Sequence, residues 1–374
     1  MPRYLLAPRR GKVPSCLSDT ILRILSGESR GTGPALLRGL LLAVEPAYAG
    51  LMRLRNALYD RRLRKVRELP RPVVSIGNIT AGGTGKTPVV QWLAAQLRDS
   101  GCRPAILLRG YGRRAGQSSD EQALLAQSLH LPAHPPVIVR ADPDRLRGGK
   151  AVLEQDPQTD LFILDDGFQH RRLHRNFDLV LIDATNPFGF GHVHPRGLLR
   201  EPLSGLRRAH AILLTRSDQI DIPRLDELQQ TIARYCSAPI FRSRHAHAGL
   251  RLAHCAASAD PDLPLTWLSD RRFFAVAGIA NPHSLHRQLQ TLGQLVGQRW
   301  FADHHDYSPA DLAQILAEAR SAGAQAILVT EKDWVKLANL PGATDANPPL
   351  LRLALQIRFD DGHEQALLQL VRTI

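Results

Sequence analysis

The stretch from Ser75 to Pro88, SIGNITAGGTGKTP, constrains the fold more than any other part of the chain. It has the pattern of a phosphate-binding loop, although Thr80 occupies the position where the strict motif has glycine. Strand-like residues precede the loop and a helical pattern follows it, with Pro88 in the first helical turn, where its missing N–H costs nothing. Backbone N–H groups at such a strand-to-helix turn bind phosphate. This context disfavours the alternative, a chance glycine-rich turn.

Each residue type in the loop has a role in binding a nucleotide. The glycines allow positive φ and close approach, Lys86 reaches the outer phosphates, and Thr87 offers a hydroxyl to Mg²⁺. The predicted nucleotide-binding residues are Thr80, Ala81, Gly82, Gly83, Thr84, Gly85, Lys86 and Thr87.

A nucleotide site also needs carboxylates at a strand end to hold the metal ion. The run LFILDDGFQH supplies them, because four apolar residues lead directly into Asp165 and Asp166. Adjacent like charges are a costly way to build an ordinary turn, which favours a functional role. The run TEKD at 330–333 has its lysine one place late for a guanine-recognition tetrad, so the sequence favours ATP over GTP.

Short apolar runs alternate with helical patterns after Pro72, which predicts a P-loop NTPase-like, doubly wound parallel α/β sheet. The predicted strands of this unit are Val73–Ile76, Ala105–Leu108, Val137–Val139, Leu161–Leu164, Leu179–Ile182 and Ile212–Thr215, with helices at Val89–Arg98, Glu121–Leu129, Arg145–Glu154 and Leu225–Tyr235. A polar stretch with several histidines follows at 242–262. A second, smaller α/β unit is predicted beyond it, with strands at Phe273–Val276, Ala326–Val329 and Leu350–Ile357 and helices at Pro282–Leu292, Pro309–Ala322 and Glu364–Val371.

The N-terminal segment is strongly basic. Residues 1–72 carry fifteen Lys and Arg against five Asp and Glu, in a chain whose net charge is +13. From Ala35 to Leu54 the residues are mostly apolar, with a narrow polar stripe, and RRLRKVR follows at 61–67, as in an interfacial amphipathic helix. The alternative is a helix pair packed on the protein body and broken at Pro46. Nucleic acid is a weaker alternative, because no aromatic residues interleave the basic run.

Other sequence features indicate a cytosolic protein. The chain contains no run of about 18 uncharged apolar residues that would indicate a membrane span, and no signal-peptide pattern. Its four cysteines are far apart, without metal-site spacing, which favours reduced thiols. The histidines His192, His194 and those from His245 to His254 lack a carboxylate or cysteine cluster, so surface loops are expected there rather than a metal site.

Six motifs together resemble those of the tetraacyldisaccharide 4'-kinases, and they stand in the same order. The motifs are GNITAGGTGKTP, LLRGYGRR, DDGFQHRRLHRNFDLVLID, GLLREP, FADHHDYS and TEKDWVKL, of which Asp165–Arg172 is the most specific. The tetraacyldisaccharide 4'-kinases are peripheral inner-membrane enzymes of lipid A synthesis in Gram-negative bacteria. The resemblance implies transfer of the γ-phosphate of ATP, with Mg²⁺, to the 4'-hydroxyl of a lipid-linked disaccharide 1-phosphate. It covers roughly residue 20 to the C-terminus.

The resemblance also implies roles for individual residues. Lys86 corresponds to the catalytic loop lysine, and the implied metal ligands are Thr87, Asp165, Asp166 and Glu201. The implied substrate-binding residues are Gln169, His170, Arg145 and Arg200. The family's catalytic aspartate lies in a Gly-Asp-Glu-Pro motif, whereas this chain has Ser119-Asp120-Glu121-Gln122. Asp120 is the expected partner of His304 in a catalytic dyad; judged without the resemblance, Asp120 is more typical of a helix cap.

Together, the motifs and the resemblance predict a peripheral lipid kinase at the cytoplasmic face of the inner membrane. We expect a basic, membrane-associating amphipathic segment at 1–70, a P-loop kinase domain at 71–240, a linker at 241–270 and a smaller α/β domain at 271–374. No nucleic acid and no obligate protein partner is expected. Two rivals are a P-loop ATPase that acts as a nucleotide switch at the membrane, and a lipid-binding module that has lost its chemistry. A lipid-binding module without activity would lack key residues of the phosphate loop or of the acidic strand end, and this chain keeps both motifs.

Overall fold

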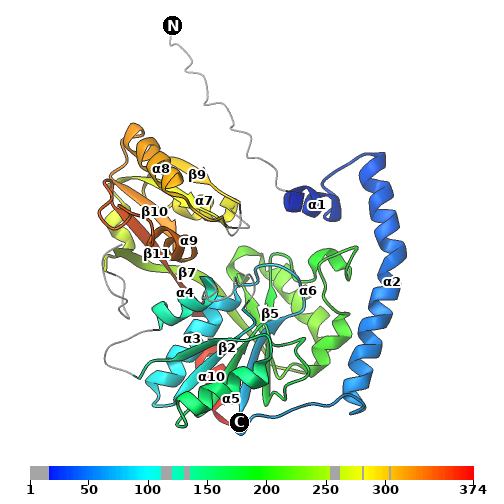
Figure 1. Ribbon diagram of the computed structural model, residues 1–374. Coiled ribbons are helices and arrows are strands. Elements are labelled where there is room, and N and C mark those ends of the chain that lie inside the picture. Colours follow the sequence, from blue (N-terminus) through cyan, green and yellow to red (C-terminus); the bar gives the residue numbers. More distant parts are fainter. Residues whose placement is uncertain (1–16, 111–119, 130–134, 253–261, 280–281, 303–304) are drawn as a thin grey trace.

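The computed structural model describes residues 17–110, 120–129, 135–252, 262–279, 282–302 and 305–374. Within these ranges eleven strands form one sheet, in the order β3-β2-β4-β1-β5-β6-β7-β11-β10-β8-β9. We call β1–β6 with their helices the first unit, and β8–β11 with α7–α9 the second unit. In Figure 1 the first unit lies below, in cyan and green, and the second unit lies above, in yellow and orange.

The first unit confirms the predicted parallel α/β arrangement. Its strands are β1 (Val73–Asn78), β2 (Pro104–Leu108), β3 (Ile138–Ala141), β4 (Leu161–Asp165), β5 (Phe177–Asp183) and β6 (Ala211–Thr215), all paired in parallel. Its helices are α3 (Lys86–Asp99), α4 (Asp120–Ser128), α5 (Arg145–Gln155) and α6 (Ile222–Ala233), preceded by α1 (Leu17–Leu25) and α2 (Thr32–Asp60). Because helices cover both faces of the sheet, the central strands β1 and β4 are buried along their length and are mostly apolar.

The second unit continues the same sheet. Its strands are β8 (Arg272–Ala277), β9 (Gln294–Trp300), β10 (Ala326–Thr330) and β11 (Leu350–Phe359), with helices α7 (Pro282–Leu289), α8 (Pro309–Ser321) and α9 (Glu331–Leu337). Helix α10 (His363–Arg372) follows β11. Strand β9 and helix α9 were not predicted. Short 3₁₀ helices cover Gly189–Gly191, Leu203–Arg208, Ser217–Gln219 and Leu265–Leu268.

Strand β7 (Ile240–Leu252) joins the two units, and it corrects the expectation of a polar linker with histidines in surface loops. Its first residues pair in parallel with β6, and Ser243–Leu252 pair antiparallel with β11. The sequence IFRSRHAHAGLRL lacks an apolar run, so its strand character was missed. Both partner strands supply the backbone hydrogen bonds that extend it.

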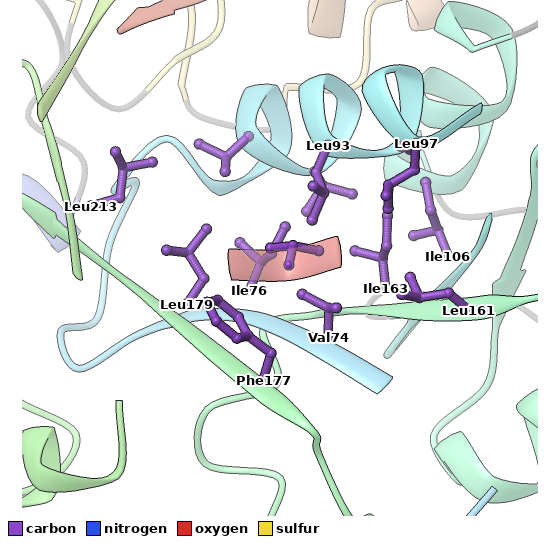
Figure 2. Close-up of a cluster of buried hydrophobic side chains, with 14 of the residues drawn as sticks. Val74, Ile76, Leu93, Leu97, Ile106, Leu161, Ile163, Phe177, Leu179 and Leu213 are labelled. Atoms are coloured by element: carbon purple, nitrogen blue, oxygen red, sulfur yellow. The ribbon is translucent and has the colours of Figure 1, made fainter. Parts of the chain in front are cut away.

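The core of the first unit includes residues from the far end of the chain. Leu93 and Leu97 of α3 pack onto Val74, Ile76 and Ile163 of the sheet, as Figure 2 shows. Leu367, Leu368 and Val371 of α10 belong to the same cluster. The Trp92 indole N–H donates to Glu364 at 2.7 Å, which fastens α10 to α3. The C-terminal helix therefore packs in the first unit, although residues 271–374 were expected to form a separate domain.

Helix α2 is one helix that continues through Pro46, not a pair broken at that residue. It lies along the outside of the first unit (Figure 1). Its polar stripe faces the protein: Glu45 accepts from the Val193 N–H at 2.9 Å, and Asp60 pairs with Arg171 at 2.7 Å. The opposite face carries exposed apolar side chains, namely Leu36, Leu40, Val44, Leu51 and Leu54.

The position of α10 generates a stability prediction. Leu367→Ala should destabilise the first unit by about 2–5 kcal/mol, since it removes a fully buried side chain from a packed cluster. The matched control is Gln369→Ala, which changes an exposed residue of the same helix and should leave stability nearly unchanged. Urea unfolding followed by circular dichroism measures both variants. Equal stability of the two would contradict the placement of α10 in this core.

Candidate active site

The phosphate loop has the predicted strand, loop and helix geometry. Strand β1 ends at Asn78, and α3 begins after Gly85, which caps the helix in the left-handed conformation with φ +80°. Gly82 is also left-handed, with φ +123°. These conformations favour glycine. A side chain added at Gly82 or Gly83 would meet nothing within 4 Å among the described atoms, so the cradle is open where a phosphate chain would lie.

Two residues at the end of β6 support this loop from the side. Thr215 Oγ1 donates to the Thr84 carbonyl at 3.0 Å, and the Arg216 guanidinium donates to the Gly83 carbonyl at 3.2 Å. Arg216 also forms an ion pair with Asp183 at the end of β5. Sequence reasoning missed these supports. The available signal was their position after buried parallel strands, whose carboxyl ends meet at one edge of the sheet.

Thr80, the departure from the strict motif, is buried and held by backbone contacts. It forms a bridge to Leu199, and the neighbouring Ala81 N–H donates to the Leu198 carbonyl at 2.7 Å. The Asn78 side-chain amide donates to the Thr80 carbonyl at 2.7 Å. The segment before Arg200 therefore fixes the start of the loop.

The predicted acidic strand end lies beside the loop lysine. Lys86 Nζ is 3.4 Å from the Asp166 carboxylate, and Arg200 donates to both Asp166 oxygens at 2.9 and 2.8 Å. Burial alone would raise the pKa of Asp166, but Lys86 and Arg200 outweigh it and hold the pKa below its ordinary value. Asp165 is buried at the last position of β4. The structure thus brings together four of the predicted residues.

Glu201 lies in a second, adjoining cluster. Arg208 donates to its two oxygens at 2.8 and 2.9 Å, Gln169 donates to one at 3.0 Å, and Asn56 of α2 donates to the other at 2.8 Å. The Arg208 ion pair lowers the pKa of Glu201 against the opposing effect of burial. In this arrangement Glu201 connects α2 to the site, and a metal ion would have to displace one of these donors.

Arg145 and His170 connect the carboxylates to a basic cavity. Arg145 is buried at the start of α5, close enough to Asp165 and Asp166 for their charges to raise its pKa, although burial lowers the pKa overall. Burial, followed by the charge of Arg145, lowers the pKa of His170 to about 4. His170 borders a cavity of about 600 Å³. The cavity is lined by Tyr59, Arg64, Lys65, Arg67, Pro143, Asp144, Leu146, His170, Arg172 and Leu173.

The predicted dyad is only partly described. Asp120 is the first residue of α4, but its side chain and the whole of His304 lie outside the described residues. Helix α4 contacts α9 of the second unit. Lys336 of α9 donates to the His305 carbonyl at 3.0 Å, so α9 connects α4 to the residue after His304. The His305 ring stacks on Phe301, with centroids 4.5 Å apart.

Several histidines that were expected in surface loops make specific contacts. His192 Nδ1 lies 2.8 Å from Glu45 of α2, and the His194 ring meets Tyr48 edge-on. His245 and His247 are partly buried on β7, in the part of this strand that pairs with β11. His254 lies outside the described residues. No group of three or more histidine, cysteine or carboxylate side chains suited to a metal ion occurs in the described ranges.

Comparison with known proteins identifies the family. The family model for Tetraacyldisaccharide-1-P 4'-kinase matches residues 37–372. The chain belongs to this family. A tetraacyldisaccharide 4'-kinase of Anaeromyxobacter sp. (strain Fw109-5) is 38% identical, with 93% of this chain and 96% of the relative covered. One from Geobacter sulfurreducens is 38% identical, over 84% of this chain and 89% of the relative.

A solved structure has the same architecture. LpxK from Aquifex aeolicus in complex with ATP superposes with a TM-score of 0.70 at 29% identity, covering 90% of this chain and 99% of that chain. As a member of this kinase family, the protein is a phosphotransferase that uses ATP. Its oxygen-rich donor set of Thr87, Asp165 and Asp166 fits Mg²⁺, which prefers carboxylate and hydroxyl oxygens and the phosphates of its substrate. When bound, Mg²⁺ would neutralise charge on the phosphates.

The low pKa of His170 predicts a pH-dependent loss of stability in this kinase. Between pH 6.5 and about 4 the unfolded chain binds a proton at this residue that the folded chain does not, so stability falls as pH falls through this window. His170→Gln should reduce the loss between pH 7 and 5 by on the order of 1 kcal/mol. The control is His174→Gln, at an exposed histidine on the same segment. Chemical unfolding at both pH values measures the slopes; equal slopes for His170→Gln and the parent protein would contradict the prediction.

Proposed function

We propose that the protein transfers the γ-phosphate of ATP to the 4'-hydroxyl of a tetraacyldisaccharide 1-phosphate, a lipid A precursor, to give lipid IVA. The observation that carries this proposal is the junction between an open phosphate loop and a basic cavity. Buried Arg145 lies near this junction: it donates to the carbonyls of Asp142 and Pro143, and Pro143 lines the cavity. Its charge also lowers the pKa of His170, which lines the same cavity. The donor phosphate and the acceptor can therefore meet at Arg145.

The cavity suits an anionic headgroup. Arg64, Lys65, Arg67 and Arg172 line it, with Asp144 as the one carboxylate in the lining. Cations at this density attract a sugar phosphate, and a lipid substrate would reach the cavity from the end of α2, where Tyr59 and Arg64 lie. Neutral His170 and Gln169 are then placed to orient the acceptor, and Arg200 holds Asp166 beside the reacting phosphate.

The rival is a nucleotide switch that hydrolyses ATP without an acceptor. Incubation of the protein with labelled ATP, Mg²⁺ and the disaccharide monophosphate in vesicles should give a lipid with two phosphates. Lys86→Ala is the control, since it removes the cation beside the phosphates and should abolish transfer. Hydrolysis of ATP with no labelled lipid would support the switch and exclude the kinase.

We further propose that Asp120 and His304 form the catalytic base. A sugar hydroxyl must lose its proton as it attacks phosphorus, and a positioned base contributes roughly 10²–10⁴ in rate. Asp120 begins α4 in the first unit and His304 belongs to the second, so the pair would form only when the units face each other. The contact between α4 and α9, and the bond from Lys336 of α9 to His305, support this arrangement.

The dyad predicts non-additive kinetics. Asp120→Ala and His304→Ala should each lower kcat by roughly 10²-fold or more with little change in KM for ATP, because both act on the acceptor hydroxyl. The double variant should be little slower than the slower single variant. Steady-state kinetics with the lipid acceptor measures all three, with His305→Ala as the neighbouring control. Multiplicative losses would show that the two residues act independently.

We also propose that the outer face of α2 binds the cytoplasmic surface of the inner membrane. This helix is long and apolar enough to cross a membrane by length and composition. Its polar stripe is occupied by contacts with the protein body, and Leu36, Leu40, Leu51 and Leu54 are each 58–69% exposed on the other face. A peripheral helix lying in the interface accounts for both observations, and the cations at 61–67 would contact anionic lipid.

Replacing these four leucines by glutamine should weaken co-sedimentation with anionic vesicles while leaving ATP binding unchanged. Glutamine keeps the charge and the helix propensity, so only the apolar term of membrane affinity is removed. The control replaces Leu63, an exposed leucine beyond the helix, in the same way. Undiminished vesicle binding by the four-leucine variant would show that another surface holds the membrane.

A further inference from the structure

A histidine of strand β7 lies directly against the phosphate loop. A methyl group added at Gly85 would lie 2.5 Å from His245 Nε2 and 2.7 Å from its Cε1. The Nε2 atom is buried and makes no hydrogen bond to any residue that the structure describes. A buried nitrogen of this kind costs free energy unless it gains a partner, so its position next to a ligand-binding loop requires an explanation.

The residues around His245 belong to the wall of the nucleotide site. Thr215 and Arg216, at the end of β6, hold the loop carbonyls of Thr84 and Gly83. The Ser243 hydroxyl donates to the Leu214 carbonyl at 3.1 Å, which fixes β7 to β6 just before His245. The ends of these parallel strands form the edge of the sheet at which α/β proteins bind ligands. Nε2 therefore lies against Gly85, the loop residue at which α3 begins.

The ring is neutral at physiological pH and available as a donor. Burial, followed by the charge of Arg216, lowers the pKa of His245 to about 4, with Asp183 opposing and His247 adding to the effect. A neutral imidazole carries its proton on one nitrogen. His247, two residues further along the strand, differs because its Nε2 lies 3.2 Å from Gln288 Oε1 of α7 and so contacts the second unit.

We propose that His245 is a nucleotide-contacting residue whose Nε2–H donates a hydrogen bond to an oxygen of the phosphate chain of bound ATP. This contact gives the buried nitrogen its missing partner. It also makes β7 part of the nucleotide site, and β7 continues as the antiparallel partner of β11 in the second unit. Bound nucleotide is thereby connected through one strand to the second unit.

Two substitutions distinguish a hydrogen-bonding role of His245 from a role in packing alone. His245→Phe keeps a ring of similar size but has no N–H, whereas His245→Gln keeps an N–H at comparable reach. Isothermal titration of the full-length protein with the Mg²⁺ complex of β,γ-methylene ATP needs no acceptor and no turnover. We expect about tenfold weaker binding for the phenylalanine variant and less than about threefold for the glutamine variant. Binding by His245→Phe as tight as that of the parent protein, or equal weakening by both variants, would overturn the proposal.

A matched control and a spectroscopic readout complete the test. Gln356→Ala changes an exposed neutral residue on the paired strand β11 and should leave affinity unchanged. With ¹⁵N-histidine labelling, the His245 Nε2 resonance, assigned by its loss in His245→Gln, should shift on addition of the ATP analogue. Adenosine, which has no phosphate, should leave it in place. An equal shift with adenosine would place His245 against the nucleoside and refute the phosphate contact.

Discussion

The pairing of Asp166 and Glu201 with cations is the constraint on which the site depends. Asp166 lies between Lys86 and Arg200, and Glu201 is held by Arg208. Removing one partner of such a pair leaves a charge buried without compensation, which costs several kcal/mol. These ion pairs join the phosphate loop, the end of β4 and the segment around residue 200. The three segments are far apart in the sequence. The arrangement holds Lys86 at the start of α3, paired with Asp166.

The same logic extends to α2, whose amphipathic character is the reverse of that of an ordinary surface helix. A surface helix normally packs its apolar stripe on the core and points its polar face to solvent. Here Asn56 reaches Glu201, Arg55 donates to the Gln169 carbonyl at 2.7 Å, and Tyr48 donates to the Arg200 carbonyl at 2.9 Å. Hydrogen bonds to residues of the candidate site therefore hold α2 on the protein body, and its apolar face remains exposed. With its apolar face bound to the membrane, as proposed, α2 would place a lipid headgroup beside the residues of the candidate site.

The sequence predicts the parts of this site that depend on local pattern. The loop from Thr80 to Thr87, the acidic end of β4 and the six strands of the first unit follow from apolar runs and turn chemistry, which act over a few residues. Arg216 and His245 escaped prediction because their roles arise from contacts across the sheet edge, 133 residues apart in the case of Arg216 and Gly83. The packing of α10 in the first unit escaped for the same reason. The sequence shows that α10 has an apolar face, but it does not show which hydrophobic core this face packs against.

The path of the chain through β7 and β11 determines how the two units can move. β7 leaves the first unit and β11 returns beside it, after which α10 packs against α3 and its core. The β7–β11 ladder of backbone hydrogen bonds therefore links the units. The ladder changes register between Ala354 and Leu355, and such an irregularity bends and twists a strand pair locally. A change in the angle between the units would then be a twist of this strand pair.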